Sequence, residues 1–386
     1  MPKNNKRRVC FVTGTRAEFG LMRTTLEAIR GHESLRLQVV ATGMHLDPRH
    51  GQMLESIQSA GFEPDAVVDW PQQSGHSPAF RAINTGKAMA DLSAAFVNLK
   101  SDIVLVVGDR VEAFAAAAAA HLSNRILAHV HGGDRALGQI DDSLRHAITK
   151  LAHLHFPATP QSAERIGRLG EDPWRIHQIG SPGNDRIEEL AAPWDDLAAR
   201  FPGLGRHRYA LLVLHPASSD PRIEKGRAEI TLATVRRSGF ERIVIVHPNN
   251  DPGCRGIQRA WAALADDPQV TCCKDLPRSI FLGLMRDAAV LAGNSSSGII
   301  EAASFQTPVA DIGPRQEGRE CSENVIHCEY DAEELALALS RIWNGGRPKK
   351  AECRNIYGSG DVGRKMAEIL ATAGPRERLL RKLITY

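Results

Sequence analysis

The stretch SDIVLVVGDRVEAFAAAAAAHLSNRILAHVHGGD at residues 101–134 decides the fold class of this chain. Residues 103–107 and 126–131 are short apolar runs, and the alanine-rich segment 111–122 between them is apolar on all sides. An apolar run, a helix packed tightly against a sheet and a second apolar run are typical of parallel α/β units. Both runs lead into polar residues, GDR at 108–110 and HGGD at 131–134, so chemically capable groups follow the strands directly.

The same alternation extends to both ends of the chain. Further strands are predicted at residues 9–13, 35–41, 154–157, 209–214, 242–246, 270–272, 289–292 and 309–312, and helices at 21–29, 85–99, 225–238 and 278–286. Glycine and proline cluster in IGSPGND at 179–185, which indicates a linker. We therefore predict an α/β protein of two Rossmann-like domains, 1–182 and 183–357, with helices in 358–386 crossing back to the first domain. Its ligand cleft is expected between the two domains.

Composition narrows the function classes. The chain has 386 residues, enough for two domains, with 42% hydrophobic and 24% charged residues. A net charge of +3 gives no reason to expect a nucleic acid or membrane partner. The seven cysteines form no CxxC or Cys/His metal pattern, which favours reduced thiols. No signal-peptide core or membrane-spanning run is found, so we expect a cytoplasmic protein.

Two segments of the second half are candidates for binding phosphate. GNSSSGIIE at 293–301 follows an apolar run, and small residues at a helix start leave backbone N–H groups for phosphate oxygens. Glu301 could accept hydrogen bonds from ribose, although an ordinary serine cap remains the alternative for the motif. The segment GPRQEGR at 313–319 contains Arg315 and Arg319, whose positive charges could offset the negative charge of a diphosphate. In the first half, GTR at 14–16 ends a strand in a similar way.

Acid–base candidates gather in the first half. Asp109 follows a strand and could act as a base or an orienting carboxylate, or cap the next helix. In AHVHGGDRALGQIDDSLRHAITK at 128–150, His131, Asp134 and Asp141 could supply acid, base and orienting groups. A zinc site using the HxH pair is the alternative, and one of Asp141 and Asp142 could serve only as a helix cap. His-Pro pairs at 215–216 and 247–248 suggest a shared rim in the second half.

These segments resemble the hydrolysing UDP-N-acetylglucosamine 2-epimerases of sialic and legionaminic acid pathways. The matching pieces are GTRAEFGLM, TGMHLDPRHG, GDRVEA, HGGDRALGQIDDSLRHAITKLAHLHF, GNSSSGIIEA and GPRQEGRE, in this order between residue 14 and about residue 363. The resemblance implies a glycosyltransferase-B-like fold and a UDP-linked 2-acetamido sugar as substrate. It implies loss of the C2 proton and of UDP, hydration of the resulting glycal, and release of a free sugar with inverted C2. No metal or other cofactor is expected, and the partners are the nucleotide sugar and further copies of the chain, as a homodimer or homotetramer.

The resemblance also assigns residues. By motif position, Asp109, His131 and Asp141 match catalytic carboxylates, and Asp134 and His215 complete the catalytic candidates. The predicted nucleotide-binding residues are Arg16, Ala17, Arg110, His215, Asn249, Ser295, Ser296, Glu301, Arg315 and Arg319. Related enzymes carry Glu in an HxEGGE motif where this chain reads HVHGGD. We therefore expect a sugar nucleotide of the bacillosamine type, with two acetamido groups, rather than UDP-N-acetylglucosamine.

Three other functions are alternatives. Non-hydrolysing 2-epimerases carry GTRPE and HVEAGLR, which are absent here. A glycosyltransferase would need an acceptor-binding surface where the acid–base cluster of residues 109–141 lies. A nucleotide-sugar sensor without catalysis is the third alternative, because the change at position 131 could mark an inactive site.

Overall fold

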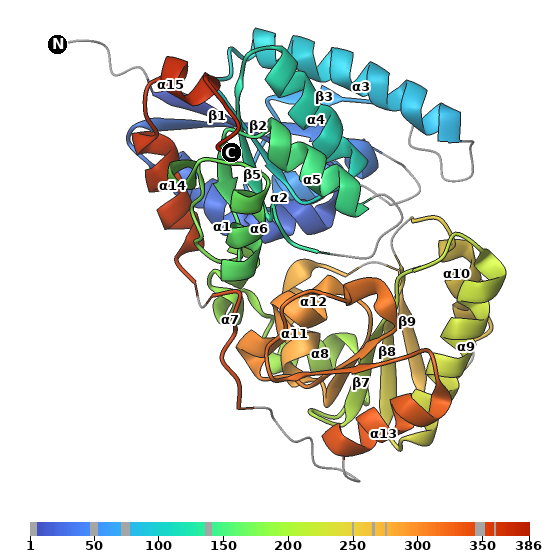
Figure 1. The fold of residues 1–386 in the computed structure, drawn as a ribbon. Helices are drawn as coiled ribbons and strands as arrows, with labels where there is room; N and C mark the ends of the chain where they lie inside the picture. Colours follow the sequence, from blue (N-terminus) through green and yellow to red (C-terminus); the bar gives the residue numbers. More distant parts are fainter. Residues whose placement is uncertain are drawn as a thin grey trace. The chain divides into compact units, whose positions relative to one another are not determined.

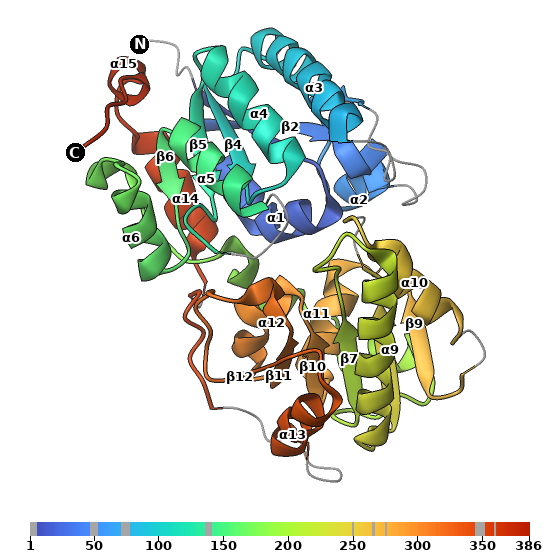
Figure 2. The same cartoon turned by 45° about the vertical axis from the view of Figure 1, so that its right-hand side comes forward.

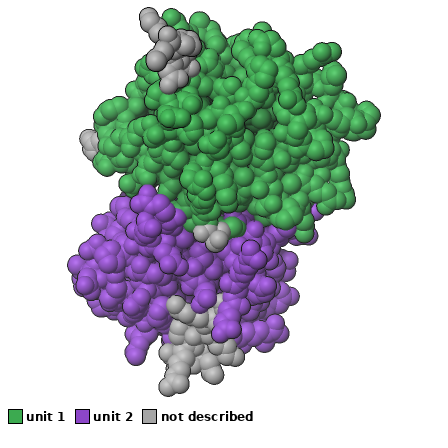
Figure 3. Space-filling model, turned by 90° about the vertical axis from the view of Figure 1, so that its left-hand side faces the viewer, with its two compact units in different colours: residues 1–134, 140–185, 358–386 green, residues 135–139, 186–357 purple. Residues whose placement is uncertain are grey.

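The computed structural model describes residues 6–46, 53–70, 78–135, 141–248, 251–264, 267–274, 276–343, 352–358 and 360–386. The chain divides into two compact units, and each is described by itself. Unit 1 comprises residues 1–134, 140–185 and 358–386, and unit 2 comprises residues 135–139 and 186–357 (Figure 3).

Unit 1 contains a parallel six-stranded sheet with the order β3-β2-β1-β4-β5-β6 (Figure 1). Its strands are β1 (Arg7–Thr13), β2 (Leu35–Thr42), β3 (Ala66–Val68), β4 (Ile103–Val107), β5 (Ile126–Val130) and β6 (Leu154–Phe156). Its helices are α1 (Arg16–Gly31), α2 (Met53–Ser59), α3 (Pro78–Asn98), α4 (Val111–Leu122), α5 (Asp141–Leu151), α6 (Pro160–Arg168), α14 (Val362–Thr372) and α15 (Arg376–Leu380).

Alternate residues of the unit 1 strands pack on opposite faces of the sheet. Cys10 and Val12 of β1 face a core shared with α3, α4 and α5. Val9 and Phe11 face the other core, which includes α1 and residues of α14 and α15. Helices cover both faces of the sheet (Figure 2), and the central strands β4 and β5 are therefore buried along their whole length.

Unit 2 repeats the same plan. Its sheet has the order β12-β11-β10-β7-β8-β9. The strands are β7 (Tyr209–Val213), β8 (Arg242–Val246), β9 (Val270–Cys273), β10 (Val290–Gly293), β11 (Val309–Ile312) and β12 (Val325–Cys328). The helices are α7 (Ile187–Leu190), α8 (Trp194–Arg200), α9 (Pro221–Arg237), α10 (Cys254–Ala262), α11 (Arg278–Asp287), α12 (Ser296–Ile300) and α13 (Ala332–Ile342). The predicted α/β class with two Rossmann-like sheets is confirmed.

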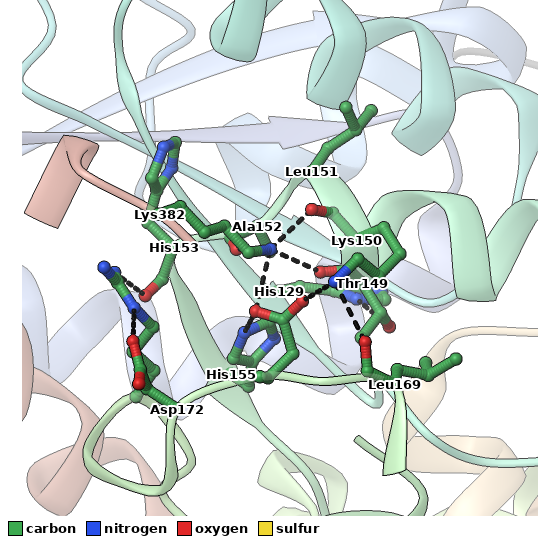
Figure 4. A network of polar contacts seen from close by, with 12 residues as sticks. His129, Thr149, Lys150, Leu151, Ala152, His153, His155, Leu169, Asp172 and Lys382 are labelled. Carbon is green, nitrogen blue, oxygen red and sulfur yellow. Dashed lines mark hydrogen bonds and ion pairs between the residues drawn. The ribbon is translucent and has the colours of Figure 1, made fainter. Parts of the chain in front are cut away.

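The C-terminal segment is anchored to unit 1 by a buried polar network (Figure 4). Lys382 donates to the carbonyl of Lys150 at 2.5 Å and pairs with Glu171 at 2.8 Å. Glu171 is buried. Its carboxylate also accepts a hydrogen bond from Nζ of Lys150 at 2.7 Å and lies 3.1 Å from Nε2 of His155. The tail thus holds the last turn of α5, the helix that begins at Asp141. No helix among the described residues is long and apolar enough to cross a membrane.

Candidate functional site

Several of the residues predicted from the sequence lie at the two points where the strand order reverses. In unit 1, GTR follows β1 and GDR follows β4, and these two strands pair in the middle of the sheet. In unit 2, His215 follows β7 and Asn294 follows β10, which also pair. Ligands of open parallel sheets bind outside the carboxyl ends of the strands at such points. Each unit therefore carries one candidate site, at its own switch point.

The turn after β1 is closed by its own side chains. Thr15 caps α1 and accepts from the N–H of Glu18 at 3.2 Å, while Oε2 of Glu18 accepts from the N–H groups of Gly14 and Thr15 at 2.8 and 3.1 Å. Burial and the neighbouring carboxylate of Glu112 raise the pKa of Glu18 to about 7. Arg16 and Ala17 are the first residues of the helix. The sequence analysis did not name Glu18, although a glutamate three residues after a threonine is the signature of a capping box.

Arg145 of α5 joins the ends of β4 and β5. Its side chain is buried, donates to the carbonyl of His131 at 2.9 Å and forms an ion pair with Asp109. Asp141 is the first residue of the same helix, and Arg110 is the N-cap residue of α4. Arg145 was not predicted as a site residue, although it lies one helical turn after Asp141 and therefore on the same face.

Both ring nitrogens of His131 have a hydrogen-bonding partner. Nδ1 lies 3.0 Å from Oδ2 of Asp134, and Nε2 lies 3.0 Å from Oγ of Ser181. Asp134 in turn accepts from Oγ of Ser162 at 2.8 Å. All four side chains are buried. The predicted pair His131 and Asp134 is therefore brought together, as a histidine whose ring is oriented by a carboxylate.

His129 has a different environment from His131. Its Nε2 lies 2.7 Å from the carbonyl of Gly108, and its Nδ1 lies 3.2 Å from Oγ1 of Thr149. Burial lowers the pKa of His129 to about 3, so the ring is neutral. These contacts fix the end of β5 against the GDR turn. In the part of the chain that the structure describes, no group of three His, Cys, Asp or Glu side chains could hold a metal ion.

Asn294 organises the site of unit 2. Its Oδ1 accepts from the N–H of His215 at 2.7 Å, and its Nδ2 donates to the carbonyl of His215 at 2.8 Å and to the hydroxyl of Tyr330 at 3.0 Å. Its own carbonyl accepts from Nη1 of Arg315 at 3.2 Å. The structure therefore gathers two predicted residues, His215 and Arg315, around an asparagine that belongs to the serine motif but was not itself predicted.

The serine motif begins a short helix. Ser295 is the N-cap of α12 and accepts from the N–H of Ser297 at 3.4 Å, and Ser296 is the first helical residue. Before it, Gly293 has φ 132°, and a Cβ at this position would lie 2.0 Å from the carbonyl oxygen of Val213. Only glycine therefore allows β10 to turn this closely past β7 into the serines.

The remaining predicted residues have identified partners or lie elsewhere. Glu301 is buried and pairs with Arg278 at 2.6 Å, a partner that the sequence analysis did not foresee. Nε of Arg319 donates to the carbonyl of Arg135 at 2.6 Å, and both residues belong to unit 2. Asn249 lies outside the described residues.

Comparison with known proteins identifies consistent relatives. A family model described as UDP-N-acetylglucosamine 2-epimerase matches residues 27–371. The chain is 34% identical to the UDP-N,N'-diacetylbacillosamine 2-epimerase (hydrolyzing) of Legionella pneumophila, over 98% of this chain and 100% of that protein. It is 30% identical to a UDP-N-acetylglucosamine 2-epimerase of Neisseria meningitidis, over 92% of each chain. A crystal structure of a Neisseria meningitidis UDP-GlcNAc 2-epimerase bound to UDP-GlcNAc has a TM-score of 0.78 at 18% identity, covering 94% of this chain and 99% of that one.

Proposed function

The chain belongs to the UDP-N-acetylglucosamine 2-epimerase family, and from this premise we propose that it is a hydrolysing member. It would convert a UDP-linked 2-acetamido sugar into UDP and the free sugar with inverted configuration at C2. The observation that carries the proposal is the arrangement around Arg145, which ties the carboxylate of Asp109 and the backbone of His131 to one helix. Acid–base groups are thereby collected at the switch point of unit 1.

In the proposed mechanism, unit 1 supplies the acid–base chemistry. Nδ1 of His131 stays with Asp134, and Nε2 takes the proton from C2 of the sugar after the substrate has displaced the hydroxyl of Ser181 from it. The electron pair of that C–H bond forms the C1–C2 double bond, and the C1–O bond breaks with its electrons going to UDP. Water then adds its oxygen to C1, and a proton is delivered to C2 from the opposite face. Asp109, held by its ion pair with Arg145, orients the sugar.

Unit 2 would bind the leaving nucleotide. Departure of UDP places negative charge on the diphosphate, and fixed donors around that charge lower the barrier. Arg315 is positioned for this by its hydrogen bond to Asn294, which also fixes His215. The N–H groups that follow Ser295 are further donors. We propose that His215, Ser295 and Arg315, together with Ser296 and Arg319, contact the phosphates. Glu301 accepts hydrogen bonds from the ribose hydroxyls.

We further propose that the preferred sugar is a 2,4-diacetamido-2,4,6-trideoxy sugar of the bacillosamine type. Two observations support this choice. The loop reads HVHGGD, and the Legionella pneumophila relative that carries this substrate in its name is similar over nearly the whole chain. The choice would be wrong if kcat/KM were higher for UDP-N-acetylglucosamine than for the UDP-linked diacetamido sugar.

The function is tested by proton NMR in deuterated water with each of the two substrates. The expected products are free sugar with deuterium at C2 and one UDP for each sugar released. His131→Asn should lower kcat by about 100-fold or more, the usual contribution of a positioned proton-transfer group. His32→Asn, a histidine paired with the exposed Glu368 on α14, is the matched control and should leave kcat unchanged.

Two outcomes would contradict the proposal. A product that is still linked to UDP would show a non-hydrolysing epimerase. Tight binding of nucleotide sugar without any turnover, by protein that is folded and intact, would instead favour a sensor.

A further inference from the structure

Tyr330, a half-buried residue that follows β12, contacts two of the segments that form the candidate site of unit 2. Its hydroxyl accepts a hydrogen bond from Nδ2 of Asn294 at 3.0 Å. Its ring lies against the backbone of Gly313, because a Cβ at this glycine would lie 2.1 Å from Cε2 of the ring. Asn294 belongs to the serine motif, and Gly313 is the first residue of GPRQEGR. One side chain therefore contacts both of the segments that carry Ser295 and Arg315.

A third segment of the site is connected to this ring through Arg227 of α9. The guanidinium carbon of Arg227 lies over the ring of Tyr330, 4.4 Å from its centre. Nη1 of Arg227 donates to Oε1 of Glu224 at 2.6 Å. Glu224 is buried and accepts from the backbone N–H groups of residues 217–218 at 3.2 and 2.8 Å. These residues belong to the loop that begins at His215, so Tyr330 is linked to all three loops of the site.

The hydroxyl of Tyr330 completes the hydrogen bonding of the Asn294 amide. Oδ1 of Asn294 accepts from the N–H of His215 at 2.7 Å, and Nδ2 donates to the carbonyl of His215 at 2.8 Å. An amide group has two N–H donors, so the second one is left for Tyr330. Asn294 is buried, and a buried donor without a partner is costly. Loss of the hydroxyl therefore favours other orientations of the amide, which hold His215 less firmly.

We propose that Tyr330 is a positioning residue for nucleotide binding in unit 2, an assignment that rests on the proposed function. Its hydroxyl fixes the amide of Asn294, and its ring supports the backbone at Gly313. Asn294 in turn fixes His215 and, through its carbonyl, Arg315. The groups that face the diphosphate therefore keep one arrangement before the nucleotide arrives, which reduces the entropy lost on binding.

Tyr209 is a matched control within the same unit. Its hydroxyl donates to the carbonyl of Leu284 at 2.6 Å, and both residues are buried. Tyr209 is the first residue of β7, whereas His215 follows the other end of that strand. Tyr209→Phe and Tyr330→Phe each remove one hydrogen-bonded hydroxyl and keep the ring, so both should lower the urea midpoint. Only Tyr330→Phe should also change the nucleotide site.

The first measurement is UDP affinity of the full chain by calorimetry. Tyr330→Phe should bind UDP about tenfold more weakly than wild type, which corresponds to about 1.4 kcal/mol. The KM of the nucleotide sugar should rise in the same proportion, because the substrate carries the same UDP group. Tyr209→Phe should keep the wild-type affinity and KM. Unchanged affinity in Tyr330→Phe, or an equal loss in Tyr209→Phe, would overturn the inference.

The second measurement is hydrogen exchange at the N–H of His215 in protein without nucleotide. This N–H is bonded to Asn294, so in Tyr330→Phe it should exchange about tenfold faster than in wild type. In Tyr209→Phe it should exchange at the wild-type rate. Equal exchange in Tyr330→Phe and wild type would show that the hydroxyl does not act through Asn294. Failure of wild-type protein to bind UDP would count against the proposed function, whereas the exchange rate bears only on Tyr330.

Discussion

Replacing Glu171 by glutamine removes one negative charge from the network that anchors the C-terminal segment (Figure 4). Glu171 is buried and contacts Lys150, Lys382 and His155 at 2.7, 2.8 and 3.1 Å. Burial alone would raise the pKa of this carboxyl, but hydrogen bonds from His155, Lys150 and Lys382 outweigh it and lower the pKa from 4.5 to about 2. The ionised form is therefore favoured by the folded state.

The magnitude follows from the difference between these two pKa values. At about 1.4 kcal/mol per pH unit, a fall from 4.5 to about 2 corresponds to about 3 kcal/mol of unfolding free energy at neutral pH. Because the pKa is depressed in the folded state, this stabilisation is complete above pH 4.5 and is lost as the pH falls towards 2. Glu171→Gln should thus lower stability by about 3 kcal/mol at pH 7, or about 6–12 °C in Tm.

The assay is urea unfolding of wild type and Glu171→Gln at pH 7, 4.5 and 3.5. The difference in unfolding free energy should narrow by about 0.4 kcal/mol between pH 7 and 4.5, where half of the unfolded carboxyl is protonated, and by about 1.4 kcal/mol in all at pH 3.5. The matched control is Glu164→Gln on α6, whose exposed ion pair with Arg168 should contribute no more than about 0.5 kcal/mol. A Glu171→Gln protein as stable as wild type at pH 7, or a difference that does not change with pH, would refute the reasoning.

Two further predictions concern the two sites, and a third concerns His327 on β12. Arg145→Met should reduce kcat/KM about 100-fold in an assay of UDP release, because Asp109 loses the cation that positions it; a loss below threefold would contradict this role. Gly293→Ala should lower the unfolding free energy by about 2 kcal/mol or more in urea, because its Cβ would lie 2.0 Å from the Val213 carbonyl oxygen; an unchanged midpoint would show that the turn can relax. The pKa of His327, raised from 6.5 to about 10, predicts stabilisation that is present below pH 6.5 and lost as pH rises through 10. Urea unfolding at pH 6 and 10 should show this loss in wild type, and the same loss in His327→Asn would contradict it.

The strands in the middle of each sheet could be predicted from the sequence, whereas two of the four edge strands could not. Residues 103–107, 242–246 and 309–312 were predicted as strands and coincide with β4, β8 and β11. β3 and β12 were missed, although the other two edge strands, β6 and β9, were predicted. β3 is only the three residues AVV, and β12 has four residues of which one is buried. Such short runs do not indicate a strand by themselves, and their conformation follows from pairing with β2 and β11.

Some residues of the candidate site could likewise be predicted from the sequence, and others could not. Asp109, His131 and His215 could be named because each lies at or just after the end of a predicted strand, and parallel strands bring their carboxyl ends to one edge. Arg145 and Ser181 could not be named from the strand pattern, because their roles depend on which partners the fold brings near them. Arg145 lies on a helix and Ser181 in the segment predicted to be a linker, yet both contact His131.

The backbone of His131 connects this geometry to function. Its φ of 61° is left-handed, a conformation that costs a residue other than glycine about 1 kcal/mol or more. Such a conformation persists only where the surroundings determine it, and here three contacts do so: Asp134 at Nδ1, Ser181 at Nε2 and Arg145 at the carbonyl. A histidine needed only for packing would not require all three. The left-handed backbone ends β5 at Val130 and directs the ring towards Asp134 and Ser181, and this single orientation is the one that the proton transfer proposed for His131 requires.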